Sequence, residues 1–93
     1  MTKTALATHE DPPPHVVDDV EQLIPLLGQS SFTQQLCHLI IFHADHLDRQ
    51  RLAVVYPVEV ATMVEFMMGQ QLRTVAQWEL FIDRLRTATK GPR

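Results

Sequence analysis

The stretch that decides the fold runs from Pro57 to Lys90 and reads PVEVATMVEFMMGQQLRTVAQWELFIDRLRTATK. Proline suits the first position of a helix, and Gly91-Pro92 supplies a stop signal at the far end. Between these signals, apolar residues recur in alternating steps of four and three, the heptad pattern of a helix packed along one seam. We therefore predict one long C-terminal helix of about 45 Å, in which Gly69 could allow a bend or a break. The seam, which the polar Gln71 interrupts, consists of Val60, Val64, Met67, Val75, Trp78, Ile82 and Leu85.

A second stripe of the same predicted helix lies about 130° from the seam. It is apolar at both ends and polar in the middle: Met63, Phe66, Gln70, Arg73, Gln77, Leu80 and Arg84. A domain of this size cannot easily cover two such faces. We therefore expect a homodimer built on the seam and a partner-binding surface on the second stripe, although Met63, Phe66 and Leu80 could instead pack under the first helix. The candidate partner-binding residues are Met63, Phe66, Arg73 and Leu80.

Two further helices are predicted upstream. The first begins near Pro12 with Asp11 as its N-cap, is kinked or ended by Pro25, and stops at Gly28. The second begins at the capping box Ser31-Phe32-Thr33-Gln34 and fades between Arg49 and Leu52. Its apolar stripe includes His43, which we expect to be buried with a pKa lower in the folded chain than in the unfolded one.

These elements predict an all-α fold: three helices in a dimeric helical bundle, with residues 1–14 as a flexible proline-containing arm and residues 15–93 as a single helical domain. The composition agrees with one small globular domain, since 45% of the 93 residues are hydrophobic and 20% are charged. No apolar run is long enough to span a bilayer, and the first residues lack the features of a secretory signal. The single cysteine, Cys37, indicates a reducing, cytoplasmic setting.

No residue pattern in the chain indicates catalysis or a bound cofactor. The three glycines are isolated, so the chain has no phosphate-binding loop or dinucleotide fingerprint. Cys37 and His38 are adjacent on a helix and do not face each other, which excludes a catalytic dyad. His43 and His46 supply only two converging metal ligands, whereas zinc needs three or four. We therefore expect neither an enzyme nor a metal or cofactor site.

The charge is distributed unevenly along the chain. Residues 1–21 carry a net charge of −4, with Lys3 against five acids, whereas residues 22–93 carry +1. The C-terminal tail holds four bases and no acid after Asp83: Arg84, Arg86, Lys90 and Arg93. This tail supports an alternative function as a DNA-associated or phage-type accessory protein. Bases at a helix C-terminus also complement its dipole. We favour this interpretation and therefore expect no nucleic-acid partner.

Three segments resemble the QslA-like quorum-sensing anti-activators of Pseudomonas. They are the acidic arm Glu10-Asp11-Pro12-Pro13-Pro14, the helix that starts Phe32-Thr33-Gln34-Gln35-Leu36, and the long helix after Tyr56-Pro57. The resemblance implies an all-helical homodimer that binds the ligand-binding domain of a LuxR-type transcription factor and blocks its dimerisation and DNA binding. The resemblance does not identify any binding residue of this chain. A small protein-binding regulator is the function that these patterns together indicate.

Overall fold

The computed structural model describes residues 16–69 and 71–90, apart from the side chain of Lys90. The arm predicted over residues 1–14 and the predicted N-cap Asp11 lie outside this part of the chain. The described residues are mostly helical, at 78%, as the sequence predicted. In chain order the elements are β1 (Val16–Val17), α2 (Val20–Leu27), α3 (Ser31–Phe42), α4 (His46–Val55), α5 (Pro57–Met68), β2 (Arg73–Thr74) and α6 (Val75–Lys90).

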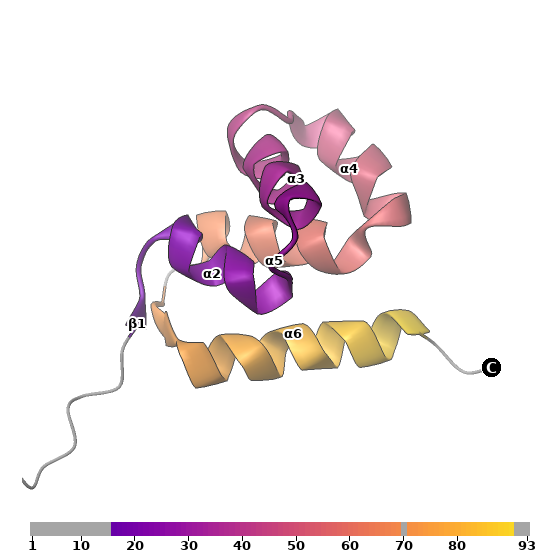
Figure 1. The fold of residues 1–93 in the computed structure, drawn as a ribbon. Coiled ribbons are helices and arrows are strands. Elements are labelled where there is room, and N and C mark those ends of the chain that lie inside the picture. The colour runs from indigo at the N-terminus through magenta and orange to yellow at the C-terminus, as the bar shows by residue number, and fades with distance from the viewer. Residues whose placement is uncertain (1–15, 70, 91–93) are drawn as a thin grey trace, which may run out of the picture.

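Helix α5 lies at the centre of the fold. Figure 1 shows α3 and α4 on one side of it and α6 on the other, with α2 between α3 and α6. The two short strands pair antiparallel, with Val16 opposite Thr74 and Val17 opposite Arg73, so they tie the start of the described chain to the start of α6. The core between the helices consists of Val17, Val20, Leu23, Ile24, Leu27, Leu36, Cys37, Ile40, Val58, Val60, Met63, Trp78 and Ile82. Burial, with Glu59 nearby, raises the pKa of the Cys37 thiol to about 11.

The prediction of one long C-terminal helix is wrong, because the segment forms two helices, α5 and α6. Helix α5 begins at Pro57 as predicted and ends at Met68, where the Gly69 N–H donates to the Glu65 carbonyl over 2.7 Å and the backbone turns extended. A new helix then begins behind a reciprocal pair of hydrogen bonds. The Thr74 hydroxyl accepts from the Gln77 N–H at 3.2 Å, and the Gln77 side chain accepts from the Thr74 N–H at 2.8 Å. This capping-box pattern favours a helix start at Val75.

The second predicted helix is also divided, into α3 and α4. Its N-cap is Ser30, one residue before the predicted Ser31, and the Ser30 hydroxyl accepts from the Thr33 N–H. Helix α3 ends at Phe42, and Asp45 and Asp48 form a capping box that starts α4 at His46. His43 therefore lies at the end of α3, exposed, and the prediction that it is buried is wrong.

The first predicted helix starts later than expected. Val16 lies in a strand, and α2 begins at Val20 with Asp19 as its N-cap, its carboxylate accepting from the Glu21 N–H at 3.1 Å. Pro25 is accommodated inside this helix, which ends at Leu27. The predicted stop at Gly28 is confirmed, since its N–H closes the last turn on the Ile24 carbonyl.

Replacing Gly69 with alanine is expected to destabilise the fold, although alanine is the better helix former. A Cβ atom at Gly69 would lie 2.6 Å from the Glu65 carbonyl oxygen, which is backbone and cannot move without disturbing the end of α5. We expect Gly69→Ala to lower the free energy of unfolding by about 1–3 kcal/mol in urea denaturation. Gly28→Ala is the matched control, because its Cβ would meet only the side chain of Thr33, at 3.1 Å, and should cost less. An unchanged or raised stability for Gly69→Ala would contradict this account of the break.

Candidate functional site

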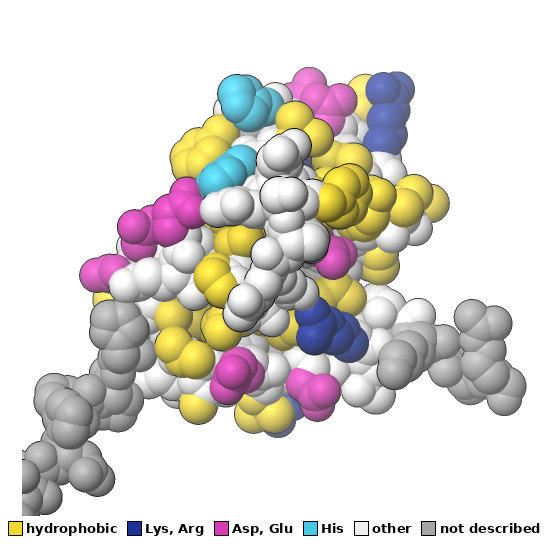
Figure 2. All heavy atoms as spheres, viewed as in Figure 1, with side chains coloured by type: hydrophobic (Ala, Val, Ile, Leu, Met, Phe, Trp, Pro, Cys, Tyr) yellow, Lys and Arg dark blue, Asp and Glu magenta, His cyan; other side chains and the backbone are white. Residues whose placement is uncertain are grey.

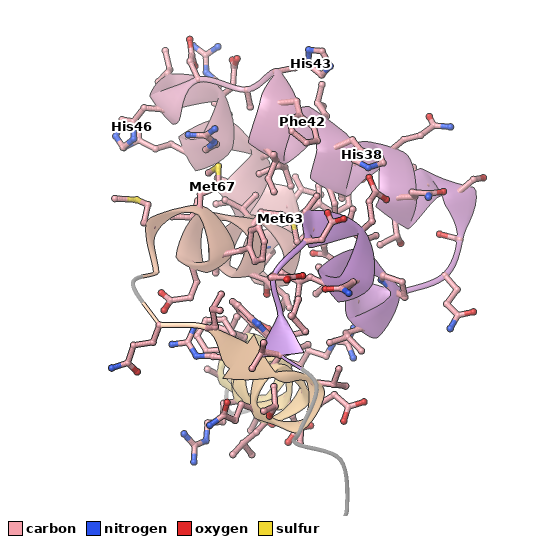
Figure 3. The ribbon with its side chains drawn as sticks, turned by 90° about the vertical axis from the view of Figure 1, so that its left-hand side faces the viewer. His38, Phe42, His43, His46, Met63 and Met67 are labelled. Atoms are coloured by element: carbon pink, nitrogen blue, oxygen red, sulfur yellow. The ribbon has the colours of Figure 1, made fainter. Side chains whose placement is uncertain are left out.

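The four candidate partner-binding residues do not share one surface. Met63 is 0% exposed and lies in the core between the helices (Figure 3). Phe66 is partly buried, with its ring centroid 6.2 Å from that of Trp78. Arg73 is partly buried and Leu80 is exposed, and both line the same hollow beside α6. Of the four, Arg73 and Leu80 are therefore the pair that another protein can contact together.

The seam residues face the core of this chain. Val60, Trp78 and Ile82 are buried, and Val64, Val75 and Leu85 are partly buried against the core. Met67 is 37% exposed (Figure 3). The seam that suggested a homodimer is thus largely covered by the chain's own helices, because α6 turns back along α5 after the break at Gly69.

Arg73 is held in place by three neighbours. Its guanidinium lies over two rings, 4.9 Å from the centroid of Trp78 and 5.2 Å from that of Phe81, within the range of cation–π attraction. It also donates to the Glu65 carboxylate over 2.8 Å, which joins β2 to α5. Because these contacts fix its direction, Arg73 forms a pre-organised wall of the hollow rather than a freely moving charge.

We name this hollow, of about 260 Å³, the α6 hollow. Its apolar part includes Leu72 and Leu80, which are 64% and 51% exposed. Arg84 adds a second positive charge, and neither ion pair of the described residues includes it. The site therefore offers exposed apolar side chains flanked by arginine, a composition suited to a protein segment with apolar and acidic groups. The residues that line it are Gln71, Leu72, Arg73, Gln77, Leu80, Phe81 and Arg84.

The basic C-terminal tail is partly used inside the fold. The Arg86 guanidinium donates to the Leu27 carbonyl oxygen over 2.7 Å and so caps the C-terminal end of α2. A cation at this end is favourable, because the last carbonyls of a helix lack partners and carry partial negative charge. Arg93 and the side chain of Lys90 lie outside the described part of the chain. Of the two arginines in α6, Arg84 is therefore the one that the described part of the fold does not engage.

The histidines do not gather at one point. His38 pairs with Glu21 of α2 at 2.5 Å, and His46 contacts the Gln50 side chain at 3.1 Å. Figure 3 shows His38, His43 and His46 well apart along α3 and α4. Among the described residues, no three His, Cys, Asp or Glu side chains lie close enough to hold a metal ion together. No helix in the same part of the chain is long and apolar enough to span a membrane.

Comparison of the chain with protein-family models, with curated proteins and with solved structures gave no match.

Proposed function

We propose that this chain is a small protein-binding regulator that occupies a surface of another protein and has no turnover of its own. The observation that carries the proposal is the α6 hollow, in which Arg73 is fixed beside the exposed Leu72 and Leu80. A few apolar and arginine anchors in one hollow carry most of the binding energy of many protein interfaces. Leu80 lies on α6 and Arg73 is fixed by its ring and carboxylate contacts, so these two anchors lose little entropy on binding.

The resemblance noted above supplies the class of partner. We propose the ligand-binding domain of a LuxR-type transcription factor, which the chain would hold as a monomer and so keep from dimerising and binding DNA in the cytoplasm. Such an inhibitor needs only to bind the monomer more tightly than the monomer binds its own copy. An acidic and apolar stretch on the regulator would complement Arg84 and Leu80, since the charge of Arg73 is already paired with Glu65.

The experiment adds the chain to a purified LuxR-type ligand-binding domain and follows the molar mass by light scattering. We expect the dimer of the regulator to disappear as a mixed complex forms. A regulator that stays dimeric, with no mixed complex at micromolar concentrations, would overturn the choice of partner.

The alternative function, binding of DNA through the basic tail, is less well supported, since Arg86 is engaged with the carbonyl of Leu27. A salt titration separates the two functions. Affinity for a DNA duplex falls steeply with salt because phosphate contacts release counterions, whereas an apolar contact responds little. We expect no salt-sensitive binding to duplex DNA.

A further inference from the structure

The α6 hollow lies next to the start of the described chain. Val17 pairs with Arg73, which lines the hollow. Val16 pairs with Thr74, the residue before α6. Because the two strands are antiparallel, β1 read backwards from Val17 to Val16 points along β2 toward the start of α6. Residues 1–15, which lie outside the described part of the chain, therefore join the fold beside this hollow.

The length of that segment matches the length of the hollow. From its first residue to Arg84, helix α6 rises about 14 Å, at about 1.5 Å per residue. Pro12-Pro13-Pro14 favour an extended polyproline conformation, which advances about 3.1 Å per residue, so the chain from Val16 back to Asp11 covers about 16 Å. The acid at position 11 can therefore reach Arg84, and the prolines can reach Leu80 on the way.

The chemistry of the segment complements that of the hollow. Glu10 and Asp11 are adjacent acids, and Arg84 belongs to neither ion pair of the described residues. Opposite charges of this kind favour contact when they are brought close together. Polyproline segments dock on surfaces lined by aromatic and apolar side chains, because they lose little entropy on binding. Leu80 and Phe81 provide such a surface in the hollow.

The other exposed side of α6 does not suit an acidic segment. Its two acids, Glu79 and Asp83, lie about 130° around the helix from the residues of α6 that line the hollow. Figure 2 shows acidic side chains over α6 on the face turned to the viewer. Arg86, the second arginine of α6, is engaged with the carbonyl of Leu27. Charge therefore directs an acidic segment to the side of α6 that carries Arg84.

We propose that residues 1–15 fold back along α6 and occupy the α6 hollow, with the prolines against Leu80 and with Glu10 and Asp11 paired to Arg84. The segment then covers the surface assigned above to partner binding. A partner must displace it, so the apparent affinity falls in proportion to the fraction of molecules in which the hollow is open. This autoinhibition rests on the proposed function, whereas the docking itself does not.

A spin label on the full chain tests the docking without any partner. The label is attached to Thr8→Cys, since Cys37 is fully buried and burial raises the pKa of its thiol to about 11, which leaves it unreactive. We expect the label to broaden the NMR signal of Leu80 strongly. Arg84→Glu in the same labelled chain should remove that broadening, because it places an acid against two acids. Arg51→Glu, an equal change of charge at an exposed residue of α4, is the control and should leave the broadening unchanged.

Reversing the charge on both sides of the contact tests the pairing itself. Glu10→Lys together with Asp11→Lys should also remove the broadening at Leu80. Combining these two substitutions with Arg84→Glu should restore it, because two lysines then face a glutamate. A parent chain without broadening, an Arg84→Glu variant with the same broadening as the parent, or a combined variant that does not recover it would overturn the docking.

A calorimetric titration with a LuxR-type ligand-binding domain tests the autoinhibition. The variant is Glu10→Gln with Asp11→Asn, which removes the two acids without adding positive charge that could attract the partner. We expect it to bind about 3- to 10-fold more tightly than the parent, because its hollow is open in a larger fraction of molecules. Equal affinities would overturn the autoinhibition. If no form of the chain binds this domain, the proposed function fails together with the autoinhibition, while the docking is decided by the spin label alone.

Discussion

Replacing Trp78 with alanine is expected to lower the free energy of unfolding by about 3–5 kcal/mol, because it removes a large buried side chain and leaves a cavity. Trp78 is 2% exposed, and its ring lies between those of Phe66 and Phe81, with centroid distances of 6.2 Å and 5.4 Å. The guanidinium of Arg73 covers the same ring. Trp78 therefore joins α5 to α6 and supports one wall of the α6 hollow. Chemical denaturation followed by circular dichroism measures the loss.

Trp78→Phe is the matched control for that prediction. The Trp78 indole N–H is buried and has no hydrogen-bond partner, so its removal relieves an unsatisfied donor while an aromatic ring remains. We expect this variant to lose much less stability than Trp78→Ala. Equal losses for the two substitutions would show that the indole N–H is satisfied in the folded protein and that its removal is costly.

Met63→Ala and Leu80→Ala are expected to separate stability from binding. Met63 is fully buried, so its truncation should cost about 2–5 kcal/mol of unfolding free energy. Leu80 is half exposed, and its truncation should change stability by less than about 0.5 kcal/mol. The sequence pattern placed both residues on one binding stripe, whereas the structure places only Leu80 at the surface. A similar loss of stability for the two variants, measured in the same denaturation experiment, would contradict this division.

Short local signals predicted several helix ends correctly. Proline at the first helical position predicted the start of α5 at Pro57, and Gly28 predicted the end of α2. These predictions succeed because they depend on the conformations that a single residue can adopt. The mostly helical character follows from the same sequence, because long segments repeat their apolar residues every three or four positions.

The apolar periodicity was misleading where it continued across a break. The seam pattern passes through Gly69 and Gln71 without a change of phase, and on periodicity alone it predicts a single helix. A different signal indicates the interruption, namely the capping box that Thr74 and Gln77 form at the start of α6. A second capping box, formed by Asp45 and Asp48, starts α4 and so divides it from α3. Both patterns are visible in the sequence and could have been used.

The candidate site was predictable only in part, because periodicity identifies a face but not what covers it. Arg73 and Leu80 were found by their place on a helical stripe. Leu72 and Phe81 were missed, since they join the α6 hollow only when the chain turns at Gly69. The exposure of Phe32 and Leu39 on α3 was missed for the opposite reason, because both residues were assigned to a buried face. Long-range packing, which a local pattern does not encode, decides both cases.

The most direct measurement of the central claim is a calorimetric titration of a LuxR-type ligand-binding domain with three forms of the chain. The parent should bind, and Leu80→Ala should bind about 5- to 150-fold more weakly, which corresponds to about 1–3 kcal/mol. Glu79→Ala is the control, since Glu79 is an exposed neighbour on α6 that does not line the hollow, and it should bind like the parent. Equal affinities for Leu80→Ala and the parent, with both folded, would contradict the claim that the α6 hollow is the binding site.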